Sequence, residues 1–204
     1  MINRKYSAIV FDLGQVLIPF DYKIFINSLN KYKTGLGESF IEKYNQNYHI
    51  HRDFEKGSIS EDEFLKIMLQ WTEHKITTEE FCFYWSNIFS LNEQVISLLP
   101  QLKVNYKLFL LSNTNPIHKR YGYQHYEFLN LFDKLFLSHE VGYVKPEKEI
   151  YLEIMNYSKI PANELIFIDD IKEYVEKAKE LGWDGIQFTG YENLINEFKL
   201  RNIL

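Results

Sequence analysis

The stretch AIVFDLGQVLIPFD, residues 8–21, joins a run of apolar residues to an abrupt polar end. Four apolar residues at 8–11 lead directly to Asp12, and Gly14 follows two positions later. A short apolar run without polar alternation is typical of a strand that is buried on both faces, as in a parallel sheet. Ligands of such sheets bind at the carboxyl ends of the strands, so Asp12 is a candidate functional residue.

Further apolar runs predict more strands of the same sheet. With YSAIVF (6–11), they are YKLFLL (106–111), KLFL (134–137), LIFI (165–168) and GIQFT (185–189). Helix-length amphipathic segments lie between the later runs, at 116–132, 146–158 and 171–182. Pro116 and Pro146 suit the first turn of a helix, and Gly182 suits a helix end. Strands alternating with helices predict an α/β fold, a Rossmann-like parallel sheet in a three-layer α/β/α core.

The connection after the first strand is far longer than a single crossover requires. It contains helical patterns, and Ser60 and Thr77 or Thr78 are candidate N-caps. The patterns lie at 21–32, 59–74 and 77–89, and 92–103 is predicted to be the helix that returns the chain to the sheet. We therefore predict a core of residues 1–20 and 91–204 and an inserted all-helical cap of residues 21–90. Such an insertion is placed to close the mouth at the carboxyl ends of the strands.

Composition excludes several kinds of partner. The formal net charge of −5 argues against broad contact with nucleic acid or anionic lipid, although a local site for a small anion remains compatible with it. No apolar run approaches the ~20 residues of a membrane span. Cys82 is the single cysteine, and the apolar run after Arg4 and Lys5 is too short for a signal peptide, so a cytoplasmic location is expected. A monomer or small homo-oligomer is expected.

Polar residues follow three of the predicted strands. Asp12 follows AIVF, Ser112 and Asn113 follow LFLL, and the pair at 169–170 follows LIFI. Parallel strands bring these positions to one edge, where several buried carboxylates are costly unless a cation neutralises them. Mg²⁺ suits such oxygen ligands and keeps positions for phosphate oxygens. Lys145, just before Pro146, adds a positive charge, so the set is typical of phosphoryl transfer.

Four motifs resemble those of the haloacid dehalogenase superfamily, subfamily I, with a C1-type helical cap. They occur in the family's order along essentially the whole chain, as VFDLGQVL, LLSNTN, VGYVKPEKEIY and IFIDD. The FDLG opening, LSNTN and the cap stretch FEKGSIS (54–60) are more similar to the branch that contains α-D-glucose-1-phosphate phosphatase and the phosphatase domain of epoxide hydrolases.

The resemblance implies a role for each matching residue. Asp12 would be the nucleophile and form an aspartyl-phosphate, and Lys145 would neutralise the nucleophile and the phosphate. Ser112 and Asn113 would hold the phosphoryl oxygens. The metal ligands would be Asp12, the Gly14 carbonyl, Asp169 and Asp170. The implied function is Mg²⁺-dependent hydrolysis of a small phosphate monoester, with a sugar phosphate as the expected substrate.

Gly14 is the main departure from the common phosphatase pattern, which has a second Asp at this position as general acid and base. Such a group typically contributes ~10²–10⁴-fold to the rate, so its loss slows the reaction and does not abolish it. Three explanations stay open: a good leaving group, a replacement such as Asp21, Glu55, His49 or His51, or a site that no longer turns over. Both histidines are expected to face solvent.

A second departure follows the acidic pair, where Ile171, Tyr174 and Lys177 stand in place of the residues that are frequent in the related branch. Two alternatives to a phosphatase follow from these observations. One is a metal-independent 2-haloacid dehalogenase, which the doubled acid at 169–170 disfavours. The other is a catalytically silent phosphate-binding protein on the same scaffold. The tyrosine-rich segment 121–128 is assigned to the core or an interface and given no chemistry.

Overall fold

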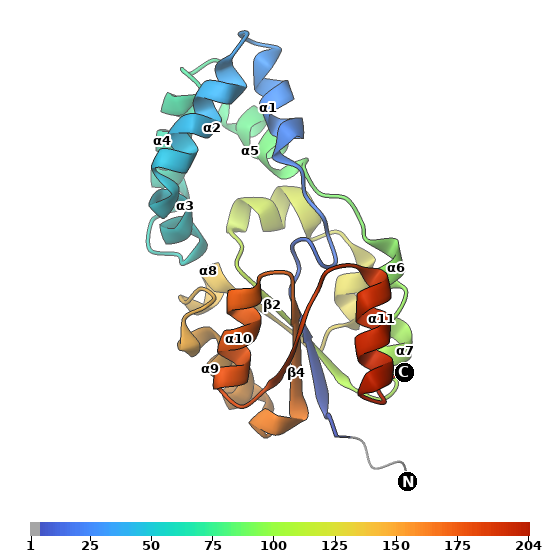
Figure 1. The fold of residues 1–204 in the computed structure, drawn as a ribbon. Helices are drawn as coiled ribbons and strands as arrows, with labels where there is room; N and C mark the ends of the chain where they lie inside the picture. The colour runs from blue at the N-terminus through green and yellow to red at the C-terminus, as the bar shows by residue number, and fades with distance from the viewer. Residues whose placement is uncertain (1–4) are drawn as a thin grey trace.

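A parallel sheet forms the centre of the computed structural model, which describes residues 5–204 (Figure 1). Residues 1–4, which include Arg4 and the start of the predicted core, lie outside the described residues. The strands have the order β3-β2-β1-β4-β5, and all neighbours are parallel. They are β1 (Ala8–Phe11), β2 (Lys107–Ser112), β3 (Lys134–Leu137), β4 (Leu165–Asp169) and β5 (Asp184–Gln187). The predicted α/β fold is confirmed.

Helices cover both faces of the sheet. Alternate residues of β1 point to opposite sides, so Ile9 and Phe11 pack in one apolar cluster and Val10 in another. The first face is covered by α6 (Glu93–Ile96), α7 (Leu99–Lys103) and α11 (Tyr191–Leu200), and the second by α9 (Lys148–Ser158) and α10 (Lys172–Glu180) (Figure 1). This arrangement gives the three layers.

A group of helices between β1 and β2 has an apolar core of its own above the sheet (Figure 1). They are α1 (Tyr22–Asn30), α2 (Leu36–Gln46), α3 (Tyr48–Glu55), α4 (Glu61–Trp71) and α5 (Thr78–Ser86). Ser60 caps α4, and Thr77 forms a capping box with Glu80 on α5. We propose that this group is the cap, with the predicted limits 21–90, over a core of 1–20 and 91–204.

The chain enters and leaves the helical group at adjacent positions. Phe20 and Phe89 form an antiparallel bridge, and their rings meet edge to face. The amide of Gln15 donates a hydrogen bond to the Phe20 carbonyl. These contacts fix where the helical group joins the sheet, directly above the carboxyl end of β1.

Two predicted helices are wrong in detail. The helix expected over 116–132 is broken into a π-helix, η1 (His118–Tyr123), and a 3₁₀-helix, η2 (Glu127–Leu131). The helix expected over 92–103 is split into α6 and α7, because Pro100 has no N–H to continue the hydrogen-bond ladder. Two short elements complete the fold, α8 (Ser138–Val141) and η3 (Ala162–Glu164).

Of two further expectations about helix ends, one agrees with the structure and one does not. Gly182 has a φ of +88° just after α10, as a helix stop requires. Pro146 lies before α9, whose first residue is Lys148, and not in its first turn. Among the described residues, no helix has the length and apolar character needed to cross a membrane.

Candidate active site

Lys145 lies at the centre of a buried ionic cluster. Its Nζ is 2.8 Å from Asp12 Oδ1 and 2.6 Å from Asp169 Oδ2, and it donates to the Leu111 carbonyl at 3.1 Å. The side chain is 1% exposed. Burial alone would lower the pKa of this ammonium group, but the two carboxylates outweigh burial and raise the pKa well above its ordinary value. Lys145 is therefore a fixed positive charge against Asp12.

Sheet register brings the strand-end residues together. Phe11 pairs with Leu110 of β2 and with Ile168 of β4, so the ends of these strands align. The Asp12 N–H donates to the Ile168 carbonyl at 2.8 Å, which continues the ladder by one residue. Side chains from three strand ends therefore share one edge of the sheet.

Three acidic side chains of this edge form a candidate metal centre. Oxygen atoms of Asp12, Asp169 and Asp170 all lie within 4.8 Å of one another. Burial raises the pKa of Asp12, Lys145 opposes this effect, and the two neighbouring acids add to it, because each negative charge disfavours the next. Such excess negative charge in a buried place favours a bound cation, and hard oxygen donors suit Mg²⁺.

The oxygens of this centre are not equally free. Asp169 Oδ1 accepts from the Ile171 N–H at 2.8 Å and Oδ2 from Lys145, whereas Asp170 is half-buried and its pKa is raised by burial and by Asp169. The Gly14 carbonyl accepts from the Val16 N–H at 2.6 Å and keeps a second lone pair. The donor set therefore fits a cation, with Asp170 and Asp12 offering the more available oxygens.

Asn113 contacts the backbone of Lys145. Its Oδ1 accepts from the Lys145 N–H at 2.7 Å and its Nδ2 donates to the Lys145 carbonyl at 3.1 Å. The side-chain amide of Asn113 thus positions Lys145. The group of Asn113 that remains for a phosphate contact is its backbone N–H. Ser112 is buried and lines the larger cavity described below, and its hydroxyl donates to the Asn113 carbonyl at 3.4 Å.

The cap contributes a buried acidic residue, Glu55, at the end of α3. Its Oε1 lies 3.1 Å from His51 Nε2 and its Oε2 accepts from Arg52 Nη1 at 3.3 Å. Burial alone would raise the pKa of Glu55. The nearby His51, Arg52 and Lys145 outweigh burial and hold this pKa below its ordinary value, so Glu55 is ionised.

The structure corrects one expectation about the cap histidines and agrees with the other. His51 is 5% exposed and lies between the rings of Tyr44 and Tyr48, so the expected solvent-facing position is wrong. The i, i+4 spacing on α3 turns His51 inward toward Glu55. His49 is exposed, as expected. Its two-residue offset from His51 places it on another side of the helix.

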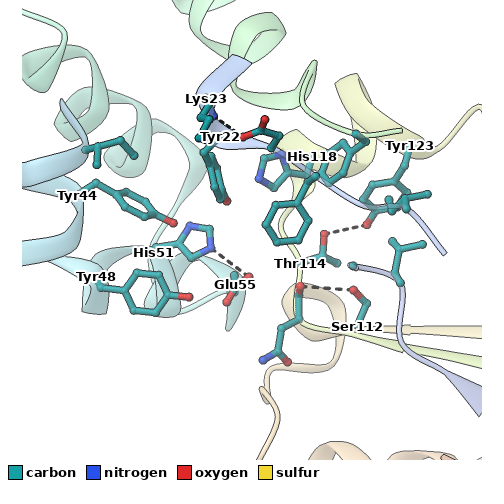
Figure 2. A pocket seen from close by; sticks show the side chains of 18 of the residues that line it. Tyr22, Lys23, Tyr44, Tyr48, His51, Glu55, Ser112, Thr114, His118 and Tyr123 are labelled. Carbon is teal, nitrogen blue, oxygen red and sulfur yellow. Dashed lines mark hydrogen bonds and ion pairs between the residues drawn. The ribbon is translucent and has the colours of Figure 1, made fainter. Parts of the chain in front are cut away.

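Two adjoining cavities lie between the helical group and the sheet. The smaller, of about 150 Å³, is lined by Asp12, Lys145 and Asp170, and the larger, of about 600 Å³, by Ser112 and several aromatic rings of the cap. Figure 2 shows the larger cavity, with Tyr44, Tyr48 and His51 on one side and Ser112, Thr114 and Tyr123 on the other. We call them the reaction cavity and the outer cavity.

Five residues line both cavities and define the passage between them, which we call the neck. They are Gly14, Phe20, Tyr48, Glu55 and Asn113. Of the predicted replacement acids, Glu55 therefore reaches the reaction cavity. Asp21 lines only the outer cavity, is exposed, and accepts from the Lys23 N–H at 2.9 Å as the cap of α1.

Phe20 explains why position 14 has no side chain. A Cβ atom built on Gly14 would lie 3.1 Å from Phe20 Cε1. A contact of this length requires the ring to shift by a few tenths of an ångström, so a side chain at position 14 would press against the Phe20 ring. Sequence reasoning identified the missing acid but not the ring beside it.

Arg52, Tyr48 and Phe20 are site residues that sequence reasoning did not single out. Arg52 Nη2 donates to the Lys145 carbonyl at 2.7 Å and so joins the cap to the core. The one available signal was position, because Arg52 lies just before the FEKGSIS stretch. Tyr123, within the segment given no chemistry, is buried and its hydroxyl lies 3.0 Å from Thr114 Oγ1.

The comparisons with known proteins agree with this architecture. The family model described as haloacid dehalogenase-like hydrolase matches residues 9–188, so the chain belongs to this family of hydrolases. The match covers Asp12, Lys145, Asp169 and Asp170.

Named relatives of similar length are phosphatases. The chain is 28% identical over 186 residues to D-ribitol-5-phosphate phosphatase of Bacteroides thetaiotaomicron, covering 88% of this chain and 90% of that protein. It is 27% identical over 206 residues to sesquiterpene phosphatase astK of Aspergillus oryzae, covering 98% and 97%. The two names differ in the group that carries the phosphate.

A solved structure of a haloacid dehalogenase (HAD) family enzyme from B. thetaiotaomicron has the same fold. It superimposes with a TM-score of 0.83 at 27% identity, over 96% of this chain and 99% of that chain. The same wild-type enzyme in complex with magnesium and inorganic phosphate gives a TM-score of 0.78 at 29% identity, over 89% and 93%.

Proposed function

We propose that the protein is a Mg²⁺-dependent phosphatase that hydrolyses a small phosphate monoester through an aspartyl-phosphate on Asp12. The observation that supports this most directly is the buried cluster of Lys145 with Asp12, Asp169 and Asp170 at one sheet edge. The relatives named as phosphatases, and the similar structure with magnesium and phosphate, support the same activity.

Each residue of the site has a part in the reaction. Lys145 holds Asp12 by a 2.8 Å ion pair, which keeps one carboxylate oxygen directed and the other free to attack phosphorus. The ester bond breaks, the alcohol departs, and the phosphoryl group is bonded to Asp12. Water then attacks phosphorus, the bond from phosphorus to the Asp12 oxygen breaks, a proton of the water passes to solvent, and inorganic phosphate leaves the restored carboxylate. When bound, the cation neutralises the acids and the charge of the phosphoryl oxygens. The Asn113 N–H binds a phosphoryl oxygen, and the Ser112 hydroxyl, which donates to the Asn113 carbonyl at 3.4 Å beside the outer cavity, turns toward the phosphoryl group to join it.

The departing oxygen requires a proton. Glu55 is ionised and therefore acts as a hydrogen-bond acceptor, and Asp21 lies outside the reaction cavity. In this proposal, solvent water supplies the proton. The cost of lacking an acid is greatest for alcohols of high pKa, so a better leaving group reacts faster.

The substrate is a small phosphorylated metabolite, and we propose a sugar or polyol phosphate. The resemblance to the sugar-phosphate branch and the relative named for D-ribitol 5-phosphate support this class. A dehalogenase is not favoured, because the acids at 169–170 would repel a halo-acid in the absence of a cation. A silent binding protein is the remaining alternative, supported by Gly14.

The test is phosphate release from a panel of sugar and polyol phosphates, with Mg²⁺ or with a chelator, by the wild type and by Asp12→Asn. We expect release that requires both the cation and Asp12. Turnover that ignores either one contradicts the mechanism. Tight phosphate binding without release would establish the silent protein, and halide release from a 2-haloacid would establish the dehalogenase.

A further inference from the structure

Glu55 is the one charged side chain of the neck through which the alcohol part of a substrate must pass. A phosphoryl group at Asp12 occupies the reaction cavity, and the rest of the substrate extends into the outer cavity. The atoms nearest to the ester oxygen therefore lie in the neck. Contacts made there depend on the first carbons of the alcohol and not on its far end.

Apart from the Tyr48 hydroxyl, the other neck residues offer little to a polar group. Gly14 has no side chain, and the ring of Phe20 is apolar. The side-chain amide of Asn113 is committed on both atoms to the Lys145 backbone. The Tyr48 side chain is partly exposed, at 46%. Glu55 is 7% exposed and is the buried polar group of this passage.

The two partners of Glu55 fix its carboxylate without saturating it. His51 Nε2 approaches one oxygen and Arg52 Nη1 the other, at 3.1 and 3.3 Å. An ionised carboxylate accepts about four hydrogen bonds, so each oxygen has a lone pair left. A buried acceptor that loses water on substrate binding needs a donor in return.

Resting on the proposed function, we propose that Glu55 selects phosphate monoesters that carry a hydroxyl on the carbon next to the phosphorylated carbon. This vicinal hydroxyl donates to the carboxylate in the neck. A substrate with an apolar group there displaces water from the Glu55 carboxylate and gives it no hydrogen-bond donor in return. An ammonium group there is a poorer match, because Arg52 and Lys145 already place positive charges beside Glu55.

The experiment compares three esters of equal chain length: 2-hydroxyethyl, 2-aminoethyl and propyl phosphate. For the wild type we expect kcat/KM for the hydroxyl ester to exceed that for the propyl ester by at least about tenfold, the range of a hydrogen bond to a charged acceptor. Glu55→Gln should reduce this ratio to within about threefold. Dividing each variant's ratio by that of the wild type removes the intrinsic reactivity of each ester.

Matched variants separate recognition from folding. Glu63→Gln changes an exposed Glu on α4, and it should leave the ratio unchanged. Glu55→Asp keeps the charge but withdraws it by one methylene, so it should also lower the ratio. Because each ratio is measured within one protein, partial loss of active enzyme does not alter it, and thermal melting identifies a variant that has not folded.

The outcomes distinguish this inference from the proposed function. Equal kcat/KM for the hydroxyl and propyl esters, a preference for the amine, or a ratio that Glu55→Gln and Glu55→Asp leave intact would overturn the role of Glu55 while the phosphatase stands. No release from any phosphate monoester would overturn the proposed function and this inference together.

Discussion

At the scale of single residues, Gly14 and Phe20 form one unit. The phenyl ring lies 3.1 Å from the position of a Cβ on Gly14, so the absence of the acid and the presence of the ring are linked. We therefore expect an Asp introduced at position 14 to press against this ring.

We predict that Gly14→Asp lowers both the melting temperature and kcat, because the new side chain displaces Phe20 from the neck. Overpacking of this kind typically costs about 1–3 kcal/mol. Phe20→Ala removes ring contacts and destabilises the fold by itself, but in that background the Asp side chain added at position 14 should cost less stability than it does in the wild type. Thermal melts and phosphate release of the two single variants and the double variant complete the cycle.

One result for Gly14→Asp would contradict this prediction. If Gly14→Asp alone raises kcat for an alkyl phosphate without loss of stability, the Phe20 ring can move aside at no measurable cost. The structural reason for Gly14 would then be wrong.

At the scale of elements, helix α3 contacts the core by two different bonds. Arg52 donates from a partly buried position to the Lys145 carbonyl at 2.7 Å, and Lys56 pairs with Glu147 at 2.7 Å in a more exposed position. The two bonds are equally short, but only the Arg52 bond reaches the backbone of Lys145, which pairs with Asp12. They form a natural comparison.

We predict that Arg52→Ala lowers kcat/KM by about tenfold, since a hydrogen bond from a charged donor is lost at Lys145 and at Glu55. Lys56→Ala is the control and should change kcat/KM less than about threefold, because exposed ion pairs contribute little. Equal losses in the two variants would show that general contact between cap and core matters, and not the bond to Lys145.

Strand β5 begins with a different ionic contact, at the edge far from the active site. The Asp184 carboxylate accepts a hydrogen bond from the Tyr6 hydroxyl. It also accepts from Lys5 Nζ at 3.1 Å and forms an ion pair with Arg201 Nε at 3.4 Å. Burial alone would raise the pKa of Asp184. The hydrogen bonds from Tyr6, Lys5 and the Gly185 N–H outweigh burial and lower the pKa to about 2.

The lowered pKa fixes the direction of a pH effect on stability. Because the folded-state pKa lies below the unfolded value of about 3.9, the contact stabilises the fold above that value and is lost as the pH falls toward 2. Asp184→Asn should therefore melt at a lower temperature than the wild type at pH 7. Melting curves from pH 7 to pH 3 should show this difference shrinking, and a difference that stays constant would contradict the assignment.

At the scale of the whole molecule, the sequence predicts the parallel sheet and the edge that carries the site. Apolar runs that end on Asp12 and Asp169 indicate strands whose carboxyl ends meet. Strand order and the broken helix at 118–131 depend on packing between distant segments, such as Gly122, where an added Cβ would lie 2.7 Å from Phe89. No local pattern reports such contacts.

The cap side of the site was harder to predict than the core side for the same reason. Glu55 was a candidate from its type and place in the chain, but its partners were not apparent. The two-residue offset between His49 and His51 predicts different helix faces but not which face is buried, whereas the four-residue spacing from His51 to Glu55 places these two side chains together. Arg52 acts on Lys145 across 93 residues of sequence, a relation that exists only in the fold.

The central claim is that Asp12 carries the phosphoryl group during turnover. The most direct measurement is mass spectrometry of the peptide that contains Asp12, after acid quenching of the enzyme during turnover with Mg²⁺ and its best phosphate ester. We predict a phosphoryl adduct on Asp12 in the wild type and none in Asp12→Asn. An adduct on another residue, or an equal adduct in Asp12→Asn, would contradict the account.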